Sequence, residues 1–171
     1  MRLLLVFVLS IAAAFPANEL SGRRAPGFSL PDSTGKLYDP QDYRGKLLIV
    51  DFMQTACPHC AEFSKILEQV RAKYRDRVAI LSIVNPPSDT KSVGAYIAEH
   101  KVTTPILFDC GQVAYSYLRP KSNSIAVPHV FLIDSQGMIQ RDYGHSDANK
   151  EILEGRGLFP VIDQLLAAPK R

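Results

Sequence analysis

The chain has 171 residues, which is enough for one compact domain and too few for two domains of ordinary size. Its 46% hydrophobic and 22% charged residues exclude a disordered chain and indicate a packed core. The net charge of +3 gives no reason to expect nucleic acid or another strongly charged partner.

The N-terminus is expected to be separate from this domain. Residues 3–14 carry no charge, and Ser10 is the one polar side chain among them. A bilayer-spanning helix needs about 20 apolar residues, so this stretch is too short and instead matches the core of a secretory signal peptide. We expect a signal peptide over 1–17 and a domain over 18–171, with an uncleaved membrane anchor as the alternative. Export to the periplasm or another extracytoplasmic compartment would allow disulfides to persist.

Strands and helices are predicted to alternate along the rest of the chain. The apolar and turn patterns first predict a linker over 18–25, a hairpin over 26–43 and strands over 47–53 and 78–84. A helix over 90–100, a strand over 105–108 and a helix over 112–118 follow. The chain then continues with a hairpin of strands over 129–134 and 138–143 and a final amphipathic helix around 159–166.

A further helix is predicted directly after the strand over 47–53. Its apolar residues recur at helical spacing on one face: Phe63, Ile66, Leu67, Val70 and Tyr74. Two strands joined by a helix form a βαβ unit, so the strands over 47–53 and 78–84 are expected to run parallel. The whole pattern predicts an α/β fold, a three-layer sandwich with a mixed central sheet.

The motif Cys57-Pro58-His59-Cys60 stands between the strand over 47–53 and the helix that follows it. Two cysteines separated by two residues at a helix start are typical of a dithiol that cycles between reduced and oxidised states. Unpaired N–H groups and the helix dipole favour a thiolate there, so Cys57 is the expected nucleophile. Cys60 lies one turn further into the helix and is expected to resolve the mixed disulfide.

Two other interpretations of the motif are weaker. A structural disulfide that closes so short a loop would constrain the unfolded chain little. A zinc site would lack the second half of its ligand set, and we expect neither a metal nor a cofactor.

Two side chains are expected to support the dithiol. His59, when protonated, would raise the thiolate fraction of Cys57, so the pair Pro58-His59 is expected to modulate the site. Asp51 belongs to the preceding apolar strand, where burial would raise the pKa of its carboxyl group and let it accept the proton of Cys60. The alternatives are a histidine with no role and a carboxylate that reaches solvent or caps a helix.

Four segments together resemble the thioredoxin superfamily, and within it the exported TlpA/ResA-like branch. They are Ala25-Pro26-Gly27-Phe28-Ser29-Leu30-Pro31 with Tyr43-Arg44-Gly45-Lys46, the stretch from Leu47 to Cys60, Pro105-Ile106-Leu107-Phe108-Asp109, and Val127-Pro128-His129-Val130-Phe131-Leu132-Ile133-Asp134. The resemblance implies a thioredoxin-like fold with an N-terminal β-hairpin and a central βα insertion. It also places Asp51 where thioredoxins carry a buried aspartate.

The same resemblance identifies Pro128 as a cis-proline that faces the dithiol. A cis bond there would present the backbone of Val127 to an extended substrate strand and guide the bound peptide by β-pairing. Val127 and Pro128 are therefore the expected substrate-binding residues.

The chain departs from this branch in two ways. Ala56 stands where family members usually carry Trp, and the chain contains no Trp. The dipeptide between the cysteines is Pro-His, as in the disulfide-forming enzyme DsbA. Pro-His suggests an oxidant, whereas the TlpA/ResA-like scaffold suggests a reductant, and the direction of disulfide transfer is left open.

The resemblance therefore implies an exported thiol–disulfide oxidoreductase that exchanges disulfides with proteins through a mixed disulfide. Its partners would be protein thiols and disulfides and a redox partner protein, membrane-bound or soluble, and we expect a monomer. One alternative is a thiol peroxidase of the alkyl hydroperoxide reductase type, but Gln54 and Val50 stand where such enzymes carry Thr or Ser and Pro. Another is copper delivery through Cys57, Cys60 and His129, although copper chaperones of this fold usually separate their cysteines by three residues.

The remaining cysteine and histidines receive weaker predictions. Cys110 follows the strand over 105–108, whose end should open on the same edge as the dithiol. We expect it to be a buried or inert small residue, with a third redox cysteine as the alternative. His129 is expected to be an ordinary strand residue, and His100 and His145 are expected to be surface residues.

Overall fold

The computed structural model describes residues 21–120 and 125–168. The predicted signal peptide lies outside these residues. The predicted linker lies partly within them, and its described part is paired with other backbone. The N–H of Gly22 donates to the carbonyl oxygen of Ile139 at 2.7 Å, and the N–H of Ala25 donates to that of Gly137 at 2.9 Å. This stretch therefore runs beside the last strand of the sheet, which a polar sequence without periodicity did not indicate.

The centre of the molecule is a mixed five-stranded sheet in the order β5-β4-β3-β6-β7. Its strands are β3 (Leu47–Met53), β4 (Val78–Val84), β5 (Ile106–Phe108), β6 (His129–Ile133) and β7 (Ile139–Gly144). β3, β4 and β5 run parallel, while β6 is antiparallel to both β3 and β7. The parallel pair of the βαβ unit and the mixed sheet are as predicted.

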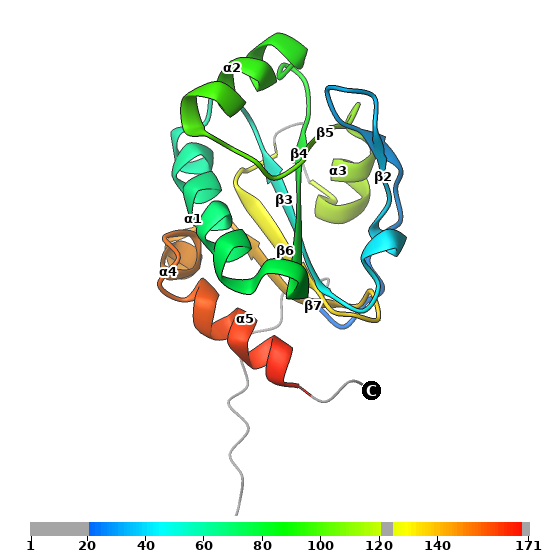
Figure 1. Ribbon diagram of the computed structural model, residues 1–171, viewed down its shortest axis with the longest axis vertical. Coiled ribbons are helices and arrows are strands. Elements are labelled where there is room, and N and C mark those ends of the chain that lie inside the picture. The colour runs from blue at the N-terminus through cyan, green and yellow to red at the C-terminus, as the bar shows by residue number, and fades with distance from the viewer. Residues whose placement is uncertain (1–20, 121–124, 169–171) are drawn as a thin grey trace, which may run out of the picture.

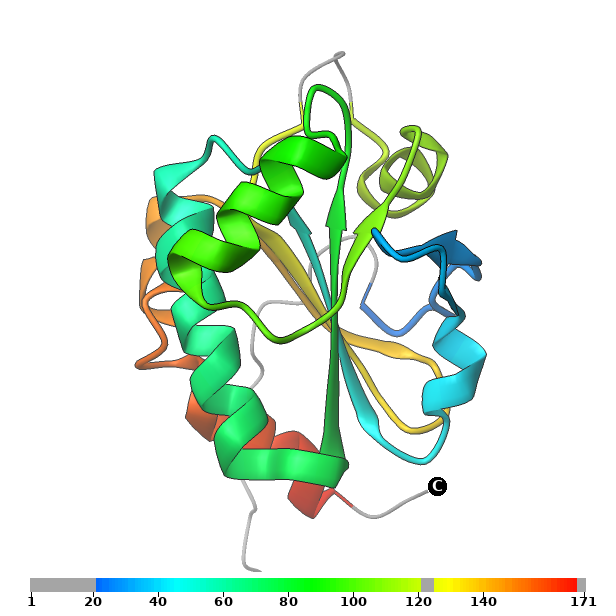
Figure 2. The same cartoon turned by 45° about the horizontal axis from the view of Figure 1, so that its top comes forward.

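Two layers of helices and loops cover this sheet (Figures 1 and 2). On one face lie α1 (Pro58–Tyr74), α2 (Thr90–His100) and α5 (Leu158–Ala167). On the other lie α3 (Gln112–Leu118) and the hairpin of β1 (Leu30–Pro31) and β2 (Leu37–Tyr38). The three-layer thioredoxin-like sandwich with its N-terminal hairpin and central βα insertion is confirmed.

The core forms because the middle strands are apolar on both sides. Every residue of β3 is buried, and alternate side chains enter opposite layers. Leu48, Val50 and Phe52 pack with α3 and the hairpin, whereas Leu47 and Ile49 pack with α1 and α5. Asp51 is the one ionisable side chain in this strand, and it faces the helical layer that carries the cysteine motif.

The helices begin and end close to the predicted residues, apart from the C-terminal region. That region is divided into the short helices η3 (Asp147–Asn149) and α4 (Lys150–Leu153) and the longer α5. Two further short helices, η1 (Pro40–Tyr43) and η2 (Arg75–Arg77), complete the described elements. Pro160 lies in the first turn of α5, where a missing N–H costs no intrahelical hydrogen bond.

The turn between β5 and α3 is held by a buried carboxylate. Asp109 is 4% exposed and accepts hydrogen bonds from the side-chain amide of Asn85 at 2.9 Å and the N–H of Ala114 at 2.8 Å. Both partners lie at the sheet edge where β4 and β5 end. The same edge carries the cysteine motif after β3, so Asp109 fixes the loops that surround it.

We predict that Asp109→Ala lowers the free energy of unfolding by about 2 kcal/mol, because it leaves the N–H of Ala114 without its acceptor and leaves the amide of Asn85 only the longer bond, 3.4 Å, to the carbonyl oxygen of residue 109. Urea denaturation would show a lower midpoint with an unchanged slope. Asp76→Ala, which removes an exposed carboxylate in η2, is the control and should leave the midpoint within the error of the measurement. Equal midpoints for the two variants would contradict this role of Asp109.

Candidate active site

Cys57 and Cys60 form a disulfide at the start of α1, with their Cα atoms 5.2 Å apart. Cys57 is the N-terminal cap residue of the helix, and its Sγ accepts the N–H of Cys60 at 3.2 Å. Cys57 is half-buried, whereas Cys60 is fully buried. No acidic residue lies in the first helical turn. The helix dipole and this N–H therefore act on the Cys57 sulfur without an opposing charge nearby in α1.

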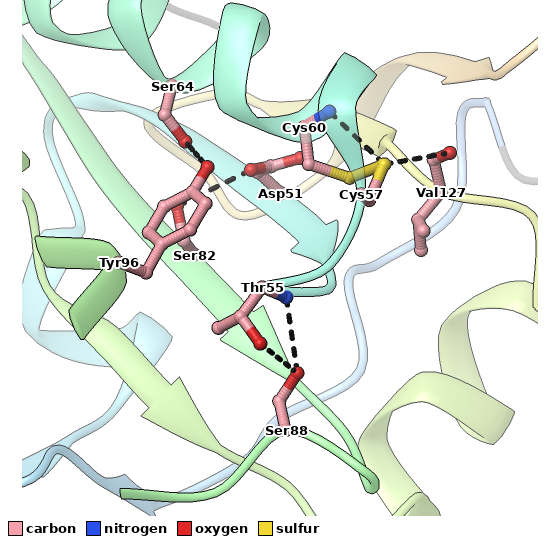
Figure 3. The surroundings of a disulfide bond; sticks show 9 residues. All are labelled: Asp51, Thr55, Cys57, Cys60, Ser64, Ser82, Ser88, Tyr96 and Val127. Carbon is pink, nitrogen blue, oxygen red and sulfur yellow. Dashed lines mark hydrogen bonds between the residues drawn. A yellow bond between two sulfur atoms is a disulfide. The ribbon is translucent and has the colours of Figure 1, made fainter. Parts of the chain in front are cut away.

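Asp51 lies beneath the disulfide, on β3 (Figure 3). It is 0% exposed, and Oδ2 accepts the hydroxyl of Ser82 over 3.4 Å, while no hydrogen-bond partner of Oδ1 is found among the described residues. Burial raises the pKa of this carboxyl to about 7, and the hydrogen bond from Ser82 opposes that rise only in part. Asp51 is therefore poised to gain or lose a proton near neutral pH.

Further hydrogen bonds hold the segments around the cysteines in place (Figure 3). Ser64, one turn after Cys60, is 2.8 Å from the hydroxyl oxygen of Tyr96 and so joins α1 to α2. Burial raises the pKa of Tyr96 to about 12, so its hydroxyl keeps its proton. The N–H of Thr55 donates to the hydroxyl of Ser88 at 3.2 Å, which ties the segment before Cys57 to the loop after β4.

The loop before β6 faces the exposed side of the disulfide. The Val127–Pro128 peptide bond is cis, as the family resemblance implied, and Pro128 is buried. The carbonyl oxygen of Val127 lies 3.8 Å from Cys57 Sγ (Figure 3). A second cis bond, Pro86–Pro87, follows β4 and was not predicted. The fold thus brings Val127 and Pro128 to Cys57, as expected for residues that would border a bound peptide.

The two remaining members of the motif are exposed. Pro58 occupies the first position of α1, where its fixed backbone angle suits a helix start. His59 projects from the same turn, and its ring lies 4.7 Å, centroid to centroid, from the ring of His145. His145 follows β7 and is exposed, as predicted, but its place beside His59 was not predicted.

The other candidates lie apart from the cysteine pair. His129 is a strand residue, as predicted; its ring stacks on Phe131, and its Nε2 is hydrogen-bonded to the carboxylate of Asp142. The ring of His100 packs edge-on against Tyr96. Cys110 follows β5 as a free thiol and is exposed, so a buried position for it is excluded. Among the described residues, no group of three or more His, Cys, Asp or Glu side chains is arranged to hold a metal ion.

Sequence reasoning missed two members of the site, Ser82 and His145. Ser82 left a signal, because it is the single polar residue in the apolar strand over 78–84. Its register, opposite Asp51 in the parallel ladder, follows once both strands are aligned from their first residues. His145 left none, since its position depends on how β7 is aligned with β6.

The chain was compared with known proteins. A model of the AhpC/TSA family matches residues 21–142. The chain belongs to the AhpC/TSA family. Thioredoxin-like protein YneN of Bacillus subtilis is 27% identical to it over 133 residues, which are 77% of this chain and 75% of YneN. Thiol-disulfide oxidoreductase ResA of Geobacillus kaustophilus is 29% identical over 121 residues, 70% of this chain and 67% of ResA.

Solved structures of similar fold were also found for this AhpC/TSA-family chain. A putative thiol:disulfide interchange protein DsbE from Chlorobium tepidum superposes with a TM-score of 0.67 at 27% identity, covering 81% of this chain and 96% of its own. A putative protein disulfide isomerase from Bacteroides thetaiotaomicron gives a TM-score of 0.71 at 24% identity and covers 86% and 91%. The resemblance to the thioredoxin superfamily and its TlpA/ResA-like branch is confirmed, and the protein is an oxidoreductase of thiols and disulfides.

We predict that Asp51→Asn stabilises the oxidised protein at pH 8 but not at pH 4. The pKa of Asp51 is higher in the folded than in the unfolded chain, so the folded state binds the extra proton, and wild-type stability falls as pH rises from about 4 through about 7. Asparagine removes this fall, which amounts to up to about 4 kcal/mol. Urea unfolding at both pH values checks it; Asp76→Asn should track the wild type, and parallel curves for all three proteins would contradict the burial argument.

Proposed function

We propose that this protein catalyses thiol–disulfide exchange with protein substrates outside the cytoplasm. The arrangement of one half-exposed and one fully buried cysteine at the start of α1 carries this proposal. It gives the two sulfurs different access to a partner, as a nucleophile and a resolving thiol require. The relatives named thiol-disulfide oxidoreductase and thioredoxin-like protein support it.

The exchange begins at Cys57. In the reduced protein its thiolate is stabilised by the N–H of Cys60 and by the N-terminus of α1. It attacks a substrate disulfide, forms a bond to one substrate sulfur and releases the other as a thiolate. An extended substrate segment beside Val127 would bring its sulfur to Cys57, because the Val127 carbonyl is already 3.8 Å from Sγ.

Cys60 and Asp51 complete the cycle. Cys60 is out of reach of solvent, so its thiol must lose a proton inside the protein before it can attack Cys57. The carboxylate of Asp51 lies below it, and a pKa of about 7 makes this group able to accept the proton near neutral pH. The thiolate of Cys60 then forms the intramolecular disulfide and releases the substrate as a thiol.

The direction of transfer depends on the reduction potential of the Cys57–Cys60 pair. Groups that stabilise the Cys57 thiolate stabilise the reduced form and make the protein more oxidising. His59 is one such group, whereas the relatives' names state no direction. Equilibration with glutathione buffers measures the potential directly, and a value near that of thioredoxin, about −270 mV, would exclude an oxidant.

Export is part of the proposal and rests on the apolar stretch over 3–14. Among the described residues, no helix is long and apolar enough to cross a membrane. Cell fractionation of a producing bacterium, with N-terminal sequencing of the recovered protein, tests export and cleavage near residue 17. Full-length protein confined to the cytoplasm would contradict this part of the proposal.

We predict that Cys57→Ser reduces insulin disulfides at less than about a thousandth of the wild-type rate, because the nucleophile is lost. Cys60→Ser should instead accumulate a mixed disulfide through Cys57, visible as a mass increase on intact protein. Cys110→Ser is the matched control and should retain the full rate. Normal insulin reduction by Cys57→Ser would overturn the assigned nucleophile, and rapid peroxide turnover with a sulfenic acid at Cys57 would favour the peroxidase instead.

We predict that His59→Ala makes the protein a stronger reductant. Loss of a stabilising interaction worth one unit of the Cys57 pKa corresponds to about 1.4 kcal/mol, or a potential about 30 mV more negative. Equilibration with glutathione at pH 7 provides the measurement. His100→Ala, which removes a histidine outside the dithiol, should leave the potential unchanged, and equal potentials in wild type and His59→Ala would show that His59 has no such role.

A further inference from the structure

A groove of about 680 Å³ lies beside the dithiol, lined by residues of α1, the Pro128 loop and the segment after β7. The pairing of β6 with β7 explains its composition. His129 is paired with Gly144, so the residues that continue from each strand pair, Pro128 on one side and His145 on the other, line the same groove. The opposite wall begins with His59. The two histidines thus meet where a substrate that borders Pro128 would lie.

Charged side chains surround this histidine pair on three elements. From α1, Glu62 faces it, with Lys65 bound to Glu62 at 2.7 Å. From η3, Asp147 faces it. Lys150, in α4, and Glu154, directly after it, also line the groove, and the Nζ of Lys150 lies 3.8 Å from the carboxylate of Glu154. The same carboxylate is 2.6 Å from the guanidinium of Arg156. The three cations balance the three carboxylates in number, and Asp147, two residues from His145, is the carboxylate nearest to it in sequence.

His145 is better placed than His59 to carry a proton at this edge of the groove. His59 is the second residue of α1, where the positive end of the helix dipole opposes a cation. His145 lies outside α1, in the segment after β7, and is free of that opposition. Their rings lie 4.7 Å apart, centroid to centroid, and are tilted by 39°, so a proton on one imidazole is close to the other.

We propose that His145 is a catalytic residue of the exchange reaction, a proton carrier for the exposed half of the site. This rests on the proposed function. The proton that Cys57 loses on forming its thiolate is held by the histidine pair. The thiolate attacks a substrate disulfide, one sulfur–sulfur bond forms as another breaks, and His145 passes its proton to the departing substrate thiolate. The two electrons that Cys57 and Cys60 together donate reduce the substrate disulfide to two thiols, and the reverse sequence oxidises it.

The test isolates the first step of the exchange. Cys60→Ser with Cys110→Ser leaves Cys57 as the single reactive thiol, which matters because Cys110 is exposed. In this background, rates are measured with two uncharged disulfides, dithiodiethanol and dipyridyl disulfide. Dithiodiethanol releases a strongly basic alkyl thiolate that benefits from a proton donor, whereas dipyridyl disulfide releases a weakly basic group that does not.

His145→Gln should slow the reaction of dithiodiethanol about tenfold, a modest loss for a general acid because the side chain is exposed. The reaction of dipyridyl disulfide should change less than about twofold. The deficit with dithiodiethanol should shrink as pH rises, because a histidine without its extra proton cannot act as the acid. His145→Phe, which keeps a ring against His59, should show the same selective loss, and His100→Gln should match the parent protein with both disulfides.

The outcomes separate the two proposals. Equal slowing with both disulfides, or slowing in His145→Gln but not in His145→Phe, would assign His145 to the shape of the groove and overturn its role as a proton carrier. No slowing would overturn it as well. Failure of Cys57 to react with either disulfide in the parent protein would instead contradict the proposed function itself.

Discussion

The pairing of β3 with both β4 and β6 is the constraint on which the site depends. β3 carries Asp51 and ends just before Cys57, so its position sets the height of the dithiol above the sheet. The parallel partner β4 brings Ser82 level with Asp51, and the antiparallel partner β6 brings Val127 and Pro128 to the same end. A one-residue slip of β3 would turn Asp51 into the opposite layer and away from the cysteines. The apolar residues on both faces of β3 oppose such a slip.

The burial of Asp51 lowers the free energy of unfolding of this protein. A carboxyl group in an apolar layer with a single long hydrogen bond costs free energy whenever it is ionised, and one of its oxygens has no partner among the described residues. The same burial holds its pKa near 7. A fully solvated or well-paired aspartate would stay ionised and could not release a proton at neutral pH. The cost to the fold and the capacity for proton transfer therefore have the same physical origin.

Much of this molecule could be predicted from local patterns, and the part that could not depends on register. Hydrophobic patterning beside a short motif predicts the strand before Cys57 and the helix after it, and so suggests Cys57, Cys60 and Asp51 as candidates. The family resemblance adds Val127 and Pro128. The position of His145 beside Pro128 could not be predicted from such local patterns. The ladder between β6 and β7 shifts register between Leu132 and Ile133, and this irregularity decides which residue after β7 arrives beside Pro128. The alternation of apolar and polar side chains along the two strands does not predict such a shift.

The two cysteines differ in access to solvent, and that difference requires two separate routes for protons. Cys60 is buried in the first turn of α1, so an internal group must take its proton, and the buried carboxyl of Asp51 lies beside it (Figure 3). Cys57 is half-buried and adjoins the groove through its neighbours His59 and Pro128; a buried acid would be out of reach of a substrate sulfur that departs there, and an exposed base is suited to the task. In the two proposals, the carboxyl of Asp51, with its pKa of about 7, serves the buried thiol, and the histidine pair serves the exposed one. In the proposed exchange, the asymmetry that would make one sulfur a nucleophile and the other a resolving thiol thus extends to the groups that handle their protons.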